Sequence, residues 1–308
     1  KQKTAYEIGV RLVGSEMCIR DRFIGMLVGA LSGLFGVGGG FLMTPLLIFL
    51  GIPPVVAVGS EAPHVLASSV SGVIAHWRKK NVDFKMGFFL LSGGVVGSTV
   101  GVNLFKLLKT YGQIDIVIQF LFLVFLGFIG VSMAFESAKT TIKNYRTTSA
   151  IRTKLHQHSW IHGLPFKLRF HRSKLYISAI PPILIGFFVG VLSAMMGVGG
   201  GFIMIPAMVY ILGMSTNVVV GTSLFQIIFV TANSTFFQSY LNQTVDIVLS
   251  ALMILGGVIG AQIGVRIGTK LKAEYLRGIL AILVLLVCAK ILTDLILTPS
   301  DLFSTSLI

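Results

Sequence analysis

The chain has 308 residues, of which 54% are hydrophobic and 12% charged, and its mean hydropathy is +0.89. A soluble domain carries about twice that charged fraction, so the composition excludes a soluble globular protein and indicates that lipid is the main solvent of the chain. The formal net charge of +14 could suggest nucleic-acid binding. The basic residues lie between apolar runs, however, which is typical of the positive-inside rule and argues against a nucleic-acid partner.

Apolar runs recur from Phe23 to near Leu297. Most of them approach the roughly 20 residues that a spanning helix needs. We therefore predict an all-α polytopic membrane protein with roughly 8 to 10 hydrophobic segments. Residues 1–22 are polar and resemble translated sequencing-adapter sequence. We expect a non-native or disordered leader there and leave it out of the fold prediction.

The first predicted membrane repeat covers residues 23–135. It begins with two short apolar pieces on either side of a glycine run, Gly33 to Gly40. Neither piece alone is long enough to cross the hydrocarbon core of a bilayer, so we interpret them as half-helices around a break. Three longer runs follow, and the middle one carries glycines four residues apart that permit close helix packing. These runs are Val55 to Trp77, Met86 to Leu108 (with Gly93, Gly97 and Gly101) and Ile114 to Phe135.

Residues 136–174 form the one long polar segment, with nine Lys or Arg and a single acidic residue. We interpret it as a basic cytoplasmic loop between the two repeats. The alternatives are a metal site or a contact with lipid headgroups, because four of the six histidines lie here. These are His156, His158, His162 and His171.

The second repeat, residues 175–298, copies the first, and residues 299–308 form a C-terminal tail. The stretch Gly36 to Pro45 returns as Gly197 to Pro206, and four blocks match in the same order at a nearly constant spacing along the chain. Duplicated halves are a common plan of secondary transporters.

The basic residues predict that the two repeats have inverted topology. The loop with Arg78, Lys79 and Lys80 has no basic residue in its counterpart, Gln238 to Asp246. Equivalent loops therefore lie on opposite sides, which requires an odd number of crossings per repeat. The broken segment is then either a re-entrant hairpin, or both of its arms cross fully, as Leu175 to Met196 is long enough to do.

The glycine breaks predict a site for a small anion. Irregular backbone at membrane depth persists only where it is buried in protein or lines a polar cavity. Each break precedes an apolar helix, whose unpaired N–H groups and positive dipole end would face the occupant. The alternative is a purely structural role in turns and helix contacts. The residues proposed for the breaks are Gly38, Gly39, Gly40, Gly199, Gly200 and Gly201.

Polar side chains in the following run add to this site in both repeats. Hydroxyl and amide groups can bind sulfonyl-type oxygens, and we assign Ser60, Thr222, Ser223 and Gln226 to substrate binding. Helix–helix hydrogen bonding is the alternative. Glu61 is the acidic residue deep within an apolar run, and His64 follows one turn later on the same face. Such a pair is a candidate for proton coupling, or else a structural hydrogen-bonding group.

The sequence lacks an enzyme's constellation of paired carboxylates, a nucleophile with its base, or a phosphate loop, and we predict no catalytic residue, no cofactor and no resident metal. Asp83 and Asp246, at equivalent run starts, are interpreted as helix caps.

These motifs resemble the TauE/SafE sulfite exporter family. The resemblance rests on the duplicated glycine motifs, on Gly59-Ser60 and Gly221-Thr222-Ser223, and on Ala75 to Arg78 followed by Asn81 to Asp83. It implies a permease of the bacterial inner membrane that moves sulfite, sulfoacetate or related organosulfur anions without ATP hydrolysis. Glu61 stands where the second repeat has Ser223, which departs from a symmetric site.

Two other classes of protein share some of these features. An anion channel would have the same glycine breaks, and a membrane scaffold or receptor would need neither the breaks nor Glu61. The sequence leaves open the anion, the direction, the coupling ion and the oligomeric state.

Overall fold

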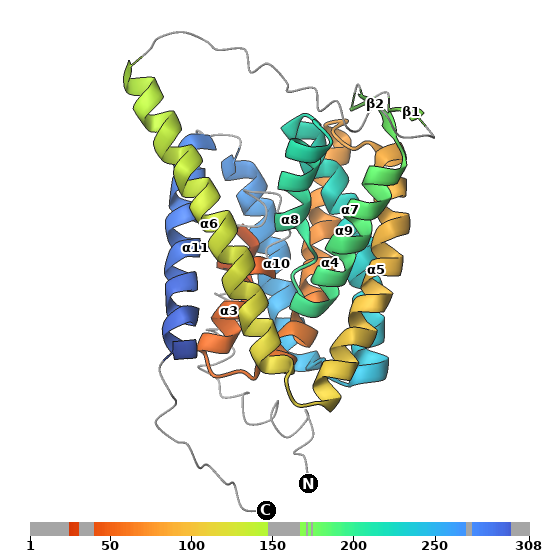
Figure 1. Cartoon of the computed structure of the whole chain (residues 1–308), viewed down its shortest axis with the longest axis vertical. Helices are drawn as coiled ribbons and strands as arrows, with labels where there is room; N and C mark the ends of the chain where they lie inside the picture. The colour runs from red at the N-terminus through yellow and green to blue at the C-terminus, as the bar shows by residue number, and fades with distance from the viewer. Residues whose placement is uncertain are drawn as a thin grey trace, which may run out of the picture.

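The structure is a computed structural model that describes residues 25–30, 40–146, 167–170, 172–173, 175–268 and 273–296. It is a bundle of long helices, with a small two-stranded hairpin at one end (Figure 1). The bundle thus has the all-α architecture that the apolar runs predict.

Helices follow the predicted runs closely in both repeats. In the first repeat, residues 25–30 are helical and are followed by α3 (Gly40–Phe49), α4 (Pro54–Arg78), α5 (Phe84–Thr110) and α6 (Ile114–Arg146). The second repeat contains α7 (Ile180–Met196), α8 (Gly201–Pro206) with a continuing π-helical turn η2 (Ala207–Ile211), α9 (Thr216–Phe237) with η3 (Gln238–Asn242), α10 (Ile247–Gly268) and α11 (Ala273–Ile296).

The segment predicted as one polar loop is partly regular. Helix α6 continues to Arg146, because residues 136–146 contain neither glycine nor proline to end it. Strands β1 (Lys167–Phe170) and β2 (Leu175–Ser178) then pair antiparallel, with Phe170 opposite Leu175. The arm expected from Leu175 to Met196 is therefore shorter than predicted, since its first residues are a strand.

Four helices among the described residues are long and apolar enough to cross a membrane: Phe84–Thr110, Ile114–Ser132, Val218–Asn242 and Ile247–Gly264. Shorter apolar helices accompany them, at Ile180–Met196, Gly201–Ile211 and Ala281–Thr293. Large apolar side chains cover the outside of the bundle; Phe128 is 72% exposed and Phe188 is 63% exposed. Such an exterior suits contact with lipid.

Helices α5 and α7, from different repeats, pack backbone to backbone through the glycine series. A Cβ placed on Gly97 or Gly101 of α5 would collide with the carbonyl oxygen of Phe187 or Val191 in α7. Gly190 of α7 in turn faces the carbonyl oxygen of Gly94. The predicted role of these glycines in close helix packing is confirmed.

The same contacts recur at the equivalent positions of the chain, between residues 25–30 and α10. Gly260 and Gly264 of α10 face the carbonyl oxygens of Met26 and Ala30, and Gly29 faces that of Gly257. Each repeat thus packs its first helix against the fourth helix of the other repeat.

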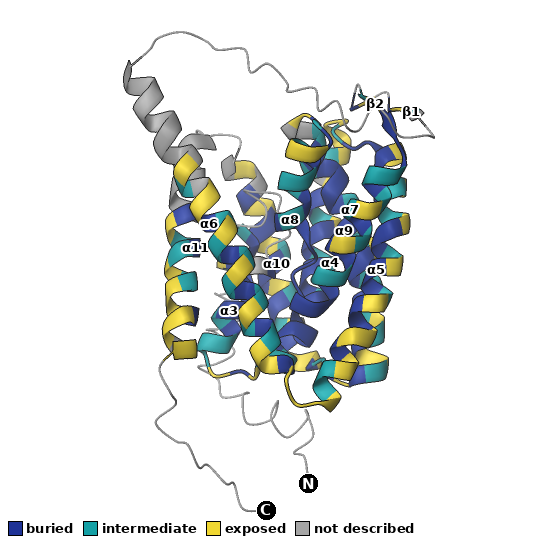
Figure 2. Ribbon diagram, in the orientation of Figure 1, coloured by how far each residue is buried: buried dark blue, intermediate teal, exposed yellow. Residues whose placement is uncertain are grey.

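Helices α4 and α9 cross the middle of the bundle in opposite directions. Gly59, near the start of α4, packs against Thr244 beyond α9, and Gly221, near the start of α9, packs against Asn81 beyond α4. In Figure 2 many residues of α4 and α9 are coloured as buried, whereas α6 and α11, at the left side of the bundle, carry many exposed residues. The interior of the protein is therefore built around α4 and α9.

The chain reverses at the second glycine break. In Figure 1 it descends α7, passes through residues 197–200 and returns in α8 and η2 toward the end of the bundle where β2 lies. Consistent with this, Ile177, just before α7, and Leu212, just after η2, belong to one apolar cluster. Helix α7 is also shorter than the helices that can cross a membrane. The segment therefore turns back inside the bundle.

Candidate functional site at the two glycine breaks

The second glycine break has a backbone that glycine alone adopts without strain. Gly197, Gly199 and Gly200 have φ values of 74°, 73° and 74°, in the left-handed region. Gly197 is the C-cap of α7, and Gly200 is the N-cap of α8, which begins at Gly201. The repeated glycines therefore end one helix and start the next inside the bundle.

In the first repeat, Gly38 and Gly39 lie outside the described residues, and Gly40 is the first residue of α3. A Cβ on Gly40 would lie 2.8 Å from the Cα of Val198 and 2.8 Å from Cγ2 of Val65 in α4. The start of α3 thus touches the second break directly.

Helices α4 and α9 form the other walls of this meeting point. A Cβ on Gly199 would lie 2.6 Å from Cγ1 of Val65 and 3.0 Å from Cγ2 of Ile227 in α9. The Thr44 hydroxyl of α3 donates a hydrogen bond to the carbonyl oxygen of Met196, at 3.4 Å. Segments from both repeats therefore converge between α4 and α9.

Glu61 lies at the N-terminal end of α3. Its side chain is fully buried, and its Oε1 is 2.6 Å from the position that a Cβ on Gly40 would take. Neither carboxylate oxygen has a hydrogen-bond partner among the described residues. A buried polar group without a partner is costly, which makes this carboxylate a candidate for function.

His64 and Gln226 occupy equivalent positions in α4 and α9. The His64 ring packs against Gly257 of α10, and Gln226 packs against Gly94 of α5, its Nε2 being 2.6 Å from where a Cβ on that glycine would lie. His64 is fully buried with both ring nitrogens unpartnered among the described residues, and the Oε1 of Gln226 is likewise unpartnered. Glu61, His64 and Gln226 thus each have side-chain atoms that are free to form a hydrogen bond with a ligand.

Ser60 and Thr222 already make one hydrogen bond each, again at equivalent positions. The Ser60 hydroxyl accepts from the N–H of Asp246, at 2.8 Å, and the Thr222 hydroxyl accepts from the N–H of Asp83, at 3.0 Å. A hydroxyl that accepts can still donate its own proton. Ser223 is buried and donates to the carbonyl oxygen of Val220, at 3.0 Å.

The prediction that Asp83 and Asp246 cap helices is confirmed. Asp83 is the N-cap of α5, and its Oδ1 accepts from the N–H of Met86. Asp246 accepts from the N–H groups of Val248 and Leu249. The two carboxylates therefore cap the starts of α5 and α10, and we assign neither of them to substrate binding.

One buried residue at the break escaped the sequence interpretation. Ser193, in the last turn of α7, is 2% exposed, its hydroxyl has no partner among the described residues, and its Cβ is 3.3 Å from where a Cβ on Gly200 would lie. The signal was present, because Leu31-Ser32 and Leu192-Ser193 match at the same spacing as the glycines. A serine in an apolar run is easily taken for a helix contact.

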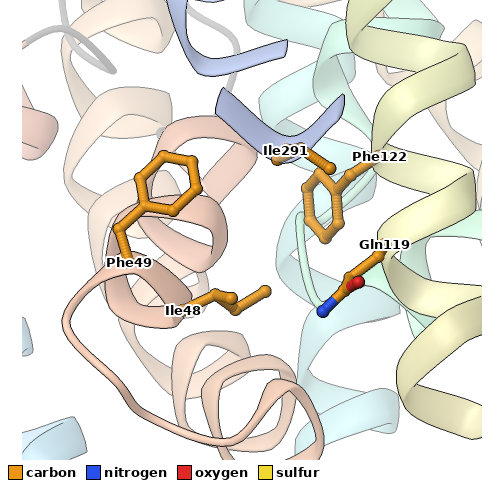
Figure 3. Close-up of a pocket in the computed structure, with 5 residues that line it drawn as sticks. All are labelled: Ile48, Phe49, Gln119, Phe122 and Ile291. Atoms are coloured by element: carbon orange, nitrogen blue, oxygen red, sulfur yellow. The ribbon is translucent and has the colours of Figure 1, made fainter. Parts of the chain in front are cut away.

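A hollow between α3, α6 and α11 differs from this site in its lining. Figure 3 shows its lining residues, Ile48, Phe49, Gln119, Phe122 and Ile291, which are apolar except for one amide. None of the predicted site residues lines it. The lining of this hollow resembles a lipid-facing surface and lacks the group of polar donors that an anion site needs.

The four histidines of the basic segment lie outside the described residues. Within the described part of the chain, no three His, Cys, Asp or Glu side chains come together as a metal site would need. The loop metal site therefore remains an untested alternative.

A bundle of apolar helices, in which a broken helix meets the start of α3 beside buried polar side chains, defines a polytopic membrane protein of the transporter class. The sequence profile described as "Sulfite exporter TauE/SafE" matches residues 23–291, and the chain belongs to this family.

Relatives agree with this assignment. The chain is 28% identical over 270 residues to the "Probable membrane transporter protein YjnA" of Bacillus subtilis (strain 168), covering 87% of this chain and 97% of the relative. It is 26% identical to "Probable membrane transporter protein YunE" of the same organism, covering 88% and 96%. "Sulfite exporter TauE/SafE family protein 3" of Arabidopsis thaliana is 30% identical over 37% of this chain and 22% of its own length. No solved structure matches the chain. The protein is a membrane transporter and not an enzyme.

Proposed function

We propose that this protein is a secondary transporter of small organosulfur anions, such as sulfite or sulfoacetate, in the bacterial inner membrane. The observation that carries the proposal is the meeting of the start of α3 with the second break between α4 and α9. There Gly40 touches Val198, beside the buried and unpartnered Glu61. A bundle of apolar helices does not need a buried carboxyl group beside a helix break for its stability, whereas a permease needs a polar site in its interior.

The proposed topology is an inverted repeat. Its support is that α4 and α9 run in opposite directions, so equivalent segments begin at opposite ends of the bundle. The end at which α4 finishes carries Arg78, Lys79 and Lys80, whereas the equivalent segment after α9 carries Asn242 and Gln243. Under the positive-inside rule the first of these ends faces the cytoplasm.

The anion would lie between the N-terminal ends of α3 and α8. The proposed backbone contacts are the glycines of the two breaks, including Gly38 and Gly39, because helix N-termini present unpaired N–H groups to an anion. Gln226 and the hydroxyls of Ser60, Thr222 and Ser223 are proposed to donate to its oxygens. The Glu61–His64 pair is proposed to exchange a proton during transport.

The choice of organosulfur substrates rests on the name of the family and on the chemistry of the donors. Neutral hydroxyl, amide and backbone N–H groups suit an oxyanion that spreads its charge over several oxygens. The interior adds no buried Lys or Arg among the described residues.

Purified protein in liposomes tests the proposal. We expect uptake of labelled sulfite or sulfoacetate to saturate with concentration and to rise when a pH gradient drives protons in the same direction as the anion. A protein with Gly200 replaced by Val serves as the inactive control. Absence of uptake for each anion would refute organosulfur transport, and ionic current in planar bilayers far above transporter turnover would show a channel instead.

A further inference from the structure

Glu61 occupies the place where the first repeat should receive an anion. The first N–H groups of α3 have no partner within the helix and favour a negative charge at its start. The fully buried side chain of Glu61 lies there, against Gly40. The chain therefore places its own ionisable carboxyl group at this helix end.

The second repeat has no carboxylate at the equivalent position. Ser223 stands there in place of Glu61, and its hydroxyl bonds within its own helix, to Val220. The two helix ends thus differ, because one meets a carboxyl group and the other does not, although they occupy equivalent positions in the two repeats. Because Gly40 touches Val198, an anion placed between the breaks is next to Glu61. Two negative charges this close repel strongly in a poorly solvated interior.

We propose that the Glu61 carboxylate and the transported anion compete for the N-terminal end of α3, so that the anion binds only when Glu61 is protonated. This inference rests on the proposed anion transport. It specifies the coupling, since each anion binds together with one proton, so that a singly charged anion adds no net charge to the site.

Few other ionisable groups can take part. His64 lies one turn along α4, while α3, α7, α8, α9 and residues 197–200 contain no ionisable residue. The lysines of α5 lie near its two ends, and α10 has Asp246 before it and Arg266 in its last turn. The charged residues of α6 are the exposed Asp115 in the first turn and residues beyond Phe135. The test must therefore separate Glu61 from His64.

The experiment measures binding of methanesulfonate to the purified protein by calorimetry, from mildly acidic to mildly alkaline pH. This probe keeps one negative charge throughout, so any pH dependence belongs to the protein. We expect the dissociation constant of the wild type to rise as Glu61 ionises, approaching about tenfold per pH unit, because one proton is bound with each anion. Heats measured in buffers of different ionisation enthalpy should show about one proton taken up per anion.

Replacing the carboxylate should improve binding. In Glu61→Gln we expect a dissociation constant that does not change with pH and that, at the alkaline end, is at least about tenfold lower than in the wild type. Glu61→Ser, which copies the second repeat, should also lose the pH dependence. Asp115→Asn, which removes an exposed carboxylate, should behave as the wild type.

Three results would overturn the inference: a wild-type affinity independent of pH, weaker binding by Glu61→Gln throughout, or a pH dependence that survives in Glu61→Gln and disappears in His64→Gln. The wild-type measurement decides even where a variant fails to fold. A different failure, in which methanesulfonate, sulfite and sulfoacetate bind to neither the wild type nor the variants, would refute anion transport itself.

Discussion

Replacing Gly200 by Ala separates the two reasons for a glycine at the second break. Gly200 has a φ of 74°, and a left-handed backbone costs a residue with a Cβ about 1–2 kcal/mol. The added methyl group would also lie 2.5 Å from Cγ1 of Val189 and 3.2 Å from its carbonyl oxygen. Overpacking of this kind costs about 1–3 kcal/mol, so we expect a total loss of about 2–5 kcal/mol.

Gly213 provides a matched control. Its φ is 72°, but nothing lies within 4 Å of the position that a Cβ would take. Gly213→Ala should therefore cost only the backbone term, about 1–2 kcal/mol. The difference between the two variants, about 1–3 kcal/mol, then measures the contact with α7.

The assay compares unfolding of both purified variants in the same detergent and their uptake of labelled sulfoacetate in liposomes. We expect Gly200→Ala to be the less stable variant and to lose transport, and Gly213→Ala to transport as the wild type does. Equal stability of the two variants would show that the contact with Val189 contributes nothing. Normal transport by Gly200→Ala would contradict a role of the break in the substrate path.

Three further predictions test the topology, the caps and the hydroxyls. With Cys18 and Cys288 replaced by Ser, single cysteines at the exposed positions Arg78 and Gln243 should react with a membrane-impermeant maleimide from opposite sides; reaction from the same side would contradict the inverted repeat. The Asp83 Oδ2 also accepts from the N–H and hydroxyl of Ser173. Asp83→Ala should therefore destabilise the protein by about 1–3 kcal/mol more than Asp246→Ala in denaturant unfolding. The buried N–H of Asp246 loses its acceptor in Ser60→Ala. That variant should lose about 1–3 kcal/mol of stability and show a raised KM for sulfoacetate; an unchanged KM would leave Ser60 a structural role alone.

Hydrophobic runs and glycine spacing were sufficient to predict the helices and one class of contact. The four-residue spacing of Gly93, Gly97 and Gly101 places them on one face, and a face without Cβ atoms is best filled by another backbone. The sequence could not show that the partner of this face is α7 of the other repeat. That pairing depends on which surfaces meet after folding, and the sequence pattern is the same for any partner.

The basic segment shows the opposite limit. Composition predicted a polar loop after Phe135, but α6 reaches Arg146, because a helix already begun continues through residues that do not stop it. The β1–β2 hairpin has strands of only four paired residues. Strands this short in a basic stretch show too little alternation to be recognised from the sequence.

The position of the candidate site residues within apolar runs is enough to predict that they are buried. It is not enough to predict which residues they contact. Glu61 and His64 share a helix face, as residues one turn apart must, but nothing in the pattern decides whether that face meets the other repeat or a neighbouring helix. The contacts of Glu61 with Gly40 and of His64 with Gly257 arise from segments far apart in the chain.

The packing of each repeat's first helix against the fourth helix of the other repeat has a consequence for biogenesis. Residues 25–30 pack against α10. Most of the chain lies between Gly29 and its contact Gly257 and is therefore synthesised before the two can meet. The first half is therefore synthesised before α7 and α10, and the glycine faces of residues 25–30 and α5 stay without their partner helices until the second half has been inserted into the bilayer. Two separately expressed halves, each with its broken segment, would face the same requirement and should assemble only with each other.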